Sequence, residues 1–400
     1  MGMDERRVVS SRRGMSRRDL LKGLGFVAGG VILLDGCAVP SPPVAAPLPT
    51  PGAPDQAPFP DGVIAGDPAP DGSVIWTRVT AATDGSPIPV LWTVADDDTF
   101  STIRAGGMML ATAADGYCVS VPVTGLEADS WYVYRFEVDG TIGRTGRLRT
   151  TPAPGSSPDH LRFAFACCQQ LNPSWFVAHK AIAAEPGLDF FMHLGDYVYV
   201  SDTGTQTVDD YRGCYRRWRE RPELRDLHAA LPTVAIWDDG EYYNGIDRTG
   251  PPQRLANAKQ AWFEAWPFLN AGDDNIYRAV RWGDLADIPV LDVRSHSDPD
   301  RDDVQLTTDD TAPMRSTLGT DQFTWLTNLL GSSTAAWRLV GQGFPIQPWR
   351  LVNLEFLRPF RPDQPPGGGI VIPSDEWDQY PSERRDLLKY LADHGITNNI

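Results

Sequence analysis

Four short apolar segments of the sequence each end in side chains that can bind a metal ion or an anion. The segments are residues 161–168, 188–196, 232–239 and 288–294, and the groups at their ends are Cys168, Asp196, Asp238, Asp239 and Arg294. In open α/β sheets ligands bind beyond the carboxyl ends of the strands, so we expect these groups to converge on one crevice. Charged groups gathered at one rim need a compensating ion, or their protonation shifts. The pattern therefore predicts a metal centre.

Each of these residues also has a simpler interpretation. A thiol after an apolar strand commonly belongs to the core, and an aspartate there commonly caps a helix. Four such strand ends in succession favour the metal site. A carboxylate such as Asp196 can bridge two cations, and clustered cations can neutralise a phosphate group and activate a nucleophilic water or oxide. A thiolate or phenolate favours a transition metal of higher valence, whereas oxygen ligands alone suit calcium or magnesium.

The charge of the chain limits its partners. The 400 residues carry a formal net charge of −16, and the first 36 contain seven Arg or Lys against four Asp or Glu, which leaves −19 for the rest. Such a surface repels nucleic acid and anionic membrane, so we expect no nucleic-acid binding. It also repels a phosphate ester unless bound cations reverse the local field.

The elements that must position the reactive groups fall into two regions. Residues 61–152 contain short alternating strands, which predict a β-sandwich; the clearest are residues 73–79, 89–94 and 131–138. This sandwich shows no catalytic constellation, so we expect it to support the rest. Residues 158–400 alternate apolar strands with helical stretches, as in an α/β domain, and the expected helices are residues 173–184, 211–230 and 256–266. The segment 377–384 is expected to begin a further helix.

The amino terminus has the features of an export signal. Arg17 and Arg18 precede an apolar run, residues 24–34, that is too short to be a durable membrane span. Residues 1–37 therefore predict a twin-arginine signal and export by the twin-arginine translocase. An ordinary signal peptide with two chance arginines is the alternative.

Residues 34–37 resemble a lipoprotein cleavage box, which predicts lipidation and membrane anchoring at Cys37. Cleavage and release is the alternative. Residues 38–60 are rich in proline and would form a semi-rigid linker. The protein would then work outside the cytoplasm, on the outer face of the cytoplasmic membrane, in the periplasm or in the medium.

Five sequence blocks, in order, resemble the alkaline phosphatase D family of metallophosphoesterases. The blocks are Phe165–Gln169, His193–Tyr199, Trp237–Glu241, Leu291–Ser295 and Trp377–Arg384. Residues 63–68 and 76–78 also resemble the small amino-terminal domain of the family. The resemblance implies an α/β fold of layered, metallophosphoesterase-like sheets that follows an all-β, fibronectin type III-like sandwich.

The resemblance also implies metal ligands. Carried over position by position, Cys168 and Tyr199 would bind ferric iron, and Asp196 would bridge the iron to calcium. Asp239 and Asn244 would help to hold the second metal cluster. For Tyr199, an ordinary aromatic residue at a strand end remains the alternative.

The implied activity is that of a phosphoric ester hydrolase. Members of the family are expected to cleave phosphate monoesters or diesters by attack of a metal-bound hydroxide or oxide on phosphorus, with no covalent enzyme intermediate. Asp196, Asp239 and Arg294 would take part in catalysis, with Arg294 contacting the phosphate. Asp238 and Glu241 would support the ligands from behind.

Three features depart from the family. Gly240 stands where the family has a histidine, which can donate to the departing oxygen or stabilise the transition state. Cys167 replaces a serine beside Cys168, so the two thiols could be oxidised together or compete for metal. The sequence ends at Ile400, before a segment of further ligands, and we interpret this as a truncation, with a natural non-catalytic variant as the alternative. The rival function is a catalytically impaired surface lipoprotein that binds metal or phosphate.

Overall fold

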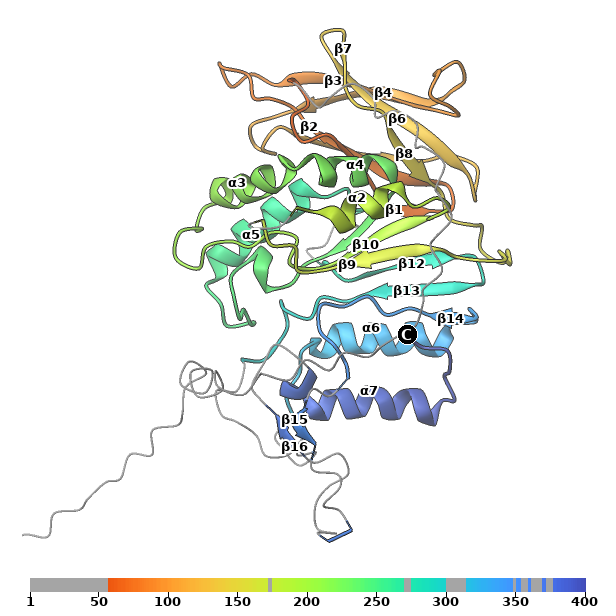
Figure 1. The fold of residues 1–400 in the computed structure, drawn as a ribbon, viewed down its shortest axis with the longest axis vertical. Helices are drawn as coiled ribbons and strands as arrows, with labels where there is room; N and C mark the ends of the chain where they lie inside the picture. Colours follow the sequence, from red (N-terminus) through yellow and green to blue (C-terminus); the bar gives the residue numbers. More distant parts are fainter. Residues whose placement is uncertain are drawn as a thin grey trace, which may run out of the picture.

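The computed structural model describes residues 57–171, 175–269, 275–299, 314–347, 350–353, 359–360, 369–371 and 377–400 (Figure 1). The predicted export signal and Cys37 lie outside the described residues. None of the helices in these ranges is long and apolar enough to cross a membrane.

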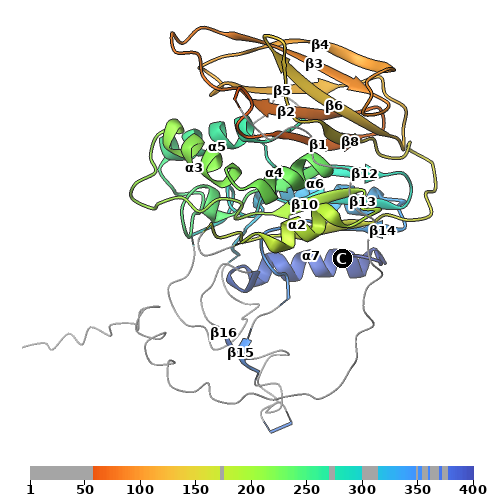
Figure 2. The ribbon, with the colours of Figure 1, turned by 45° about the horizontal axis from the view of Figure 1, so that its top comes forward.

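Two sheets pack face to face in the amino-terminal region (Figure 2). One face is made by β1 (Val63–Ala69), β2 (Gly72–Arg78) and β5 (Cys118–Val123). The other is made by β3 (Ile88–Ala95), β4 (Ile103–Ala111), β6 (Trp131–Val138), β7 (Thr141–Ile142) and β8 (Gly146–Arg149). Alternate residues of β6 are buried between the sheets, as the two-residue period of a strand requires. The β-rich character of this region is confirmed, and its likeness to fibronectin type III domains stays a prediction.

A six-stranded sheet in the order β5-β2-β1-β11-β10-β9 continues into the α/β region. Its second half contains three parallel strands, β9 (Phe163–Ala166), β10 (Phe190–Leu194) and β11 (Thr233–Ile236). The two halves meet where Gly66 of β1 pairs with Thr233 of β11. A Cβ atom on Gly66 would lie only 2.7 Å from the carbonyl oxygen of Thr233, so this close approach requires glycine. One sheet therefore links the two regions that the sequence pattern separates.

A second sheet lies against the parallel strands. It has the order β12-β13-β14, with β12 (Arg278–Trp282), β13 (Ala286–Val290) and β14 (Trp337–Arg338). The fourth predicted strand, residues 288–294, thus belongs to this second sheet and not beside the other three. Apolar side chains fill the space between the sheets, among them Phe190, Met192, Val234, Val280, Trp282 and Ile288. The predicted α/β fold of layered sheets is confirmed.

Helices cover both outer faces of this pair of sheets (Figures 1 and 2). Between the parallel strands and the sandwich lie α2 (Val177–Ala184), α3 (Val208–Arg219), α4 (Pro222–Ala230) and α5 (Pro252–Ala265). Beyond the second sheet lie α6 (Gly319–Ser332) and α7 (Pro381–Asp393). The helix predicted over 211–230 is two helices, because Pro222 lacks an N–H group and suits only the first turn of a new helix.

Short elements complete the described chain. They are the 3₁₀ turns η1 (Asp239–Glu241) and η3 (Trp377–Gln379) and the antiparallel pair β15 (Arg350–Asn353) and β16 (Gly369–Val371). The helix expected to begin within 377–384 does so, at Pro381. There Glu383 accepts hydrogen bonds from the backbone of Thr317 and Leu318, so this segment joins α7 to the loop before α6.

Candidate metal centre

Three neighbouring loops bring the predicted ligands together. Because β9, β10 and β11 are parallel and adjacent, the chain leaves all three at the same edge of the sheet. Cys168 follows β9, Asp196 follows β10, and Asp238 and Asp239 follow β11. The first two loops are joined by hydrogen bonds from the N–H groups of Cys168 and Gln169 to the carbonyl oxygens of Gly195 and Asp196, both at 3.1 Å.

Two of the candidate ligands have strained backbones. Cys168 has a φ of 56° and Asp196 a φ of 57°, the left-handed region that non-glycine residues seldom occupy. Such strain persists only where the surrounding structure enforces it, and it is common at functional sites. Here it turns both side chains at the point where their strands end.

Three carboxylates form the centre of the cluster. Asp196, Asp238 and Asp239 are all buried, and each offers an oxygen within 4.8 Å of the others. Burial, the charge of Asp239 and the neighbouring Cys168 together raise the pKa of Asp196 to about 7. A buried group of like charges is unfavourable unless a cation compensates it, so the donor set fits a metal ion.

Cys168 and Tyr199 extend the donor set beyond oxygen carboxylates. The Cys168 Sγ lies 3.5 Å from Asp196 Oδ2, and the phenol of Tyr199 interacts with both Asp196 and Cys168. Burial and the charge of Asp196 raise the pKa of Tyr199. The structure thus brings the thiol, the phenol and the bridging carboxylate into one contact group. Cys167 is exposed beside them, and both thiols are free.

Glu241 holds the cluster from behind. It is 1% exposed, and its two oxygens accept the backbone N–H groups of Asp196 at 3.0 Å, Tyr197 at 2.6 Å and Asp238 at 2.9 Å. These three donors belong to two different loops. Glu241 therefore joins the turn after β10 to the turn after β11, and its supporting role for the ligands stays a prediction.

Gly240 lies directly against the bridging carboxylate. Its N–H donates to Asp196 Oδ1 at 2.9 Å, and its carbonyl oxygen accepts from Val200 at 3.0 Å. A Cβ atom at this position would come within 2.6 Å of Asp196 Oδ1 and 2.7 Å of the Val198 carbonyl oxygen. Any side chain at 240 therefore requires the 196–198 turn to move. Glycine here allows close packing of the two loops as well as removing a donor.

Arg294 reaches the cluster from the second sheet. Its guanidinium is 2% exposed, forms an ion pair with Asp238, lies 3.6 Å from Asp239 Oδ2 and stacks 4.4 Å from the ring of Phe344. From the sequence, Arg294 was predicted to contact the phosphate. In the structure it neutralises one carboxylate of the cluster, so contact with a phosphate would require it to share that charge.

Asn244 occupies the rim of the site. It is exposed on the loop after η1, and its N–H donates to Asp202 at 3.1 Å. The next residue, Gly245, donates its N–H to Asp239 Oδ2 at 2.7 Å, which keeps this loop beside the cluster. Within the described residues, no hydrogen bond joins the Asn244 side chain to the three carboxylates, and its role as a ligand stays a prediction.

Sequence reasoning missed two supports of the site. Asp292 is fully buried, and its Oδ1 accepts from Trp237 Nε1 at 2.9 Å and from the N–H groups of Arg294 at 3.0 Å and Ser295 at 2.9 Å. Its position two residues before Arg294 was the available signal. Gly343 is the second, because a Cβ there would meet Asp238 at 3.0 Å. No strand pattern marks the loop that carries it.

Comparison with known proteins shows the family of this chain. The family model described as PhoD-like phosphatase matches residues 163–400, and that of the PhoD-like phosphatase N-terminal domain matches residues 45–152. The chain belongs to the PhoD-like phosphatase family. It is 33% identical over 380 residues to alkaline phosphatase D of Bacillus subtilis (strain 168), covering 85% of this chain. It also matches a solved structure titled "Structure of PhoD" with a TM-score of 0.77 and 31% identity, covering 88% of this chain and 72% of that one.

The match covers a larger share of this chain than of its relative. This chain spans 63% of the length of the Bacillus subtilis relative. The PhoD-like family and its α/β fold are established for this chain. The three buried carboxylates form a candidate metal site. Activity, substrate and export are taken up as proposals.

Proposed function

We propose that this protein hydrolyses phosphate esters at the centre formed by Asp196, Asp238 and Asp239. The observation that carries the proposal is the packing of three buried carboxylates within 4.8 Å at the carboxyl edge of parallel strands, in a member of the PhoD-like phosphatase family. A chain of net charge −16 attracts a phosphate ester only where cations reverse the field. The acidic cluster provides the place for those cations.

The donor set suggests two kinds of metal. Cys168 and Tyr199, which both touch Asp196, would hold ferric iron, and Asp196 would bridge it to calcium held with Asp239 and Asn244. Bound metal ions would supply a hydroxide or oxide nucleophile and neutralise the phosphate. The chain itself orients these ligands by the hydrogen bonds that join its three loops.

Purified protein tests the metal assignment through colour and turnover together. A thiolate or phenolate bound to ferric iron gives visible charge-transfer absorption, so we expect a coloured protein that contains iron. Cys168→Ala should lose the iron and the absorption, whereas the neighbouring Cys167→Ser should keep both. Hydrolysis of a chromogenic phosphodiester should follow the iron content across these variants. Full iron retention by Cys168→Ala would overturn the ligand assignment.

We further propose export by the twin-arginine translocase and anchoring at Cys37, on the strength of the sequence features of residues 1–37. A folded reporter fused to residues 1–60 should leave the cytoplasm, and replacement of both Arg17 and Arg18 by Lys should stop it. Cys37→Ala should release the protein from membranes. Unchanged export of the double-lysine fusion would contradict the first proposal, and unchanged membrane association of Cys37→Ala the second.

A catalytically impaired surface lipoprotein that binds metal or phosphate is the second candidate. The close packing of Gly240 against Asp196 favours it, because no donor side chain fits there in this conformation. Loss of one such preorganised donor typically costs about 10²–10³ in rate. Iron binding without measurable hydrolysis of monoesters or diesters would support this candidate over the enzyme.

A further inference from the structure

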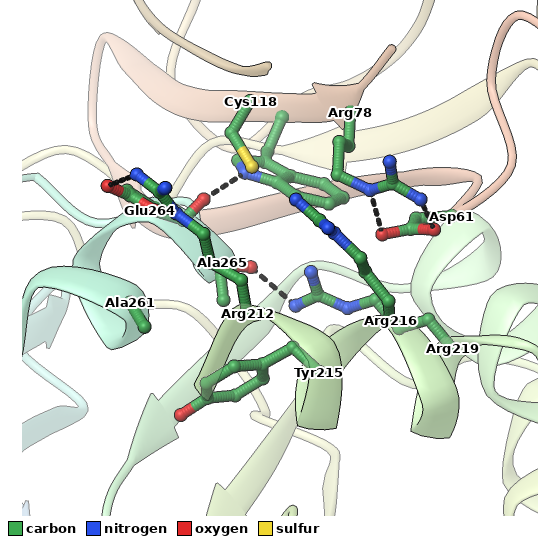
Figure 3. A pocket seen from close by; sticks show the side chains of 11 residues that line it. Asp61, Arg78, Cys118, Arg212, Tyr215, Arg216, Arg219, Ala261, Glu264 and Ala265 are labelled. Atoms are coloured by element: carbon green, nitrogen blue, oxygen red, sulfur yellow. Dashed lines mark hydrogen bonds and ion pairs between the residues drawn. The ribbon is translucent and has the colours of Figure 1, made fainter. Parts of the chain in front are cut away.

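A small pocket lies between the sandwich and helices α3 and α5, and none of its lining residues belongs to the metal centre (Figure 3). Its walls include Arg78 of β2, Cys118 of β5, and Arg212, Arg216 and Arg219 of α3. Its interior volume is about 10 Å³, which is room for about one water-sized group. Beyond this recess the pocket opens to solvent.

Two of the four arginines in the pocket are paired with carboxylates. Arg78 makes two bonds of 2.6 Å to Asp61, and Arg212 makes bonds of 2.6 and 2.7 Å to Glu264. Figure 3 shows these pairs on opposite sides, with Arg216 and Arg219 between them. Among the described residues that line the pocket, Asp61 and Glu264 are the only carboxylates. Because each of them already pairs with an arginine, neither neutralises Arg216 or Arg219.

Arg219 is buried without a carboxylate among the described residues. It is 1% exposed, and one of its terminal nitrogens donates to the carbonyl oxygen of Ala265. Its guanidinium lies 4.3 Å from the ring of Trp76 and also faces the rings of Trp266, Tyr197 and Tyr215 at 5.2 to 5.8 Å. Its Nε has no hydrogen-bond partner. A buried guanidinium whose donors are incompletely satisfied is unfavourable, and an anion would complete it.

Arg216 is the second cation of the pocket without a carboxylate partner. It is half-buried, and within the described part of the chain its side chain makes no hydrogen bond or ion pair. Burial and the nearby charge of Arg78 lower its pKa, which shows that its surroundings disfavour a further positive charge. Cys118 does not supply the missing negative charge, because burial raises the pKa of its thiol to about 12 and keeps it neutral.

We propose that this pocket binds a small inorganic anion between Arg216 and Arg219. These two guanidinium groups have no carboxylate partner among the described residues, so the pocket has two surplus positive charges within a strongly acidic protein. The recess takes a chloride ion or one oxygen of an oxyanion such as phosphate, whose other oxygens would face the open mouth. The anion would join α3 to the sandwich strands β2 and β5. This inference is independent of the proposed hydrolysis.

Chloride-35 NMR of the full chain tests the site directly, because exchange of chloride with a protein site broadens its line. We expect broadening by the unaltered protein and loss of most of it in Arg216→Gln. Removal of one charge-assisted hydrogen bond should weaken chloride by about tenfold or more. Arg216→Lys, which keeps the charge, should retain a measurable part. Arg217→Gln is the matched control, since Arg217 is the next residue of α3 and is exposed.

Added phosphate distinguishes an oxyanion site from a halide site. Displacement of the chloride signal by phosphate would identify an oxyanion site, and persistence of the signal would identify a halide site. Circular dichroism verifies that each variant is folded. Absence of broadening in the unaltered protein, or equal broadening in folded Arg216→Gln, would overturn the proposal.

Discussion

The metal centre and the arginine pocket are opposite solutions to the same electrostatic problem. The metal centre crowds three buried carboxylates around one partly shared arginine, whereas the pocket crowds four arginines around two carboxylates. Each is a local imbalance that burial makes costly. In both places the charge left over after pairing is the reason for which we propose a ligand: cations at the carboxylates and an anion at the arginines.

One residue, Tyr197, contacts both the metal centre and the arginine pocket. The N–H of Tyr197 is held by Glu241 behind the metal centre, while its ring faces Arg219 at 5.8 Å and packs against Trp266 at 4.7 Å. Its hydroxyl lies 3.0 Å from Nε2 of His228. The turn that carries the candidate ligand Asp196 is thus packed on the helix that lines the arginine pocket.

The largest effect should come from removing the shared carboxylate of the metal centre. Asp196→Ala takes away the group that Cys168, Tyr199 and Gly240 all contact, so we expect loss of bound metal and a fall in phosphodiester hydrolysis of at least about 10²-fold. Elemental analysis and a chromogenic assay measure the two losses. Asp247→Asn, on the exposed loop after η1, should change neither. Retained metal in Asp196→Ala would contradict the proposal that the three carboxylates hold the metal.

Glu241→Ala tests whether the metal centre depends on its support. Three buried N–H groups would lose their acceptor, and each unsatisfied group costs about 1–3 kcal/mol, so we expect the free energy of unfolding to fall by about 3 kcal/mol or more. Urea denaturation measures the change. Chloride binding should persist in the folded fraction, because Glu241 does not line the arginine pocket. A loss below 1 kcal/mol would show that water replaces the carboxylate.

Gly240→Ala adds one carbon atom, Cβ, and so tests the close packing of Gly240 on Asp196. The added Cβ meets Asp196 and the Val198 backbone, and overpacking of this kind typically costs about 1–3 kcal/mol. We expect lower thermal stability together with weaker metal binding, and Gly240→His should lower turnover for the same reason. An increase in turnover by Gly240→His would show that the 196–198 turn moves readily to admit a donor.

Low pH should lower the free energy of unfolding through His193, by less than the substitutions at Glu241 and Gly240. His193 is fully buried. Its burial, and to a lesser extent the charge of His179, lowers its pKa from 6.5 to about 3. The folded state keeps this ring neutral while the unfolded chain takes up a proton, so the stabilisation is complete above pH 6.5 and declines as pH falls toward 3. His193→Phe should lessen the stability loss between pH 6.5 and 5.5 by about 1 kcal/mol. Parallel pH profiles of denaturant midpoints for the two proteins would contradict this.

The sequence pattern predicted the ligands more completely than their arrangement. Cys168, Asp196, Asp238 and Asp239 stand directly after apolar strands, and parallel pairing then forces them to one edge. Arg294 was expected in the same row of strands, and it comes from the second sheet instead. Its approach to Asp238 depends on how two sheets stack, which strand patterns do not encode. The site-residue roles themselves stay predictions until the variants are measured.

By itself, the sequence determined the alternation of strands and helices, the acidic ligand set and the resemblance to a phosphatase family, because these follow from local periodicity and from motifs of adjacent residues. Tertiary structure alone decided that Gly240 packs on Asp196 and that Arg216 and Arg219 lie between α3 and the sandwich with no carboxylate partner among the described residues. Both depend on contacts between segments distant in sequence. A buried charge is compensated only if an oppositely charged or hydrogen-bonding group lies beside it. Those neighbours come into place only when the sandwich and the α/β region have packed together.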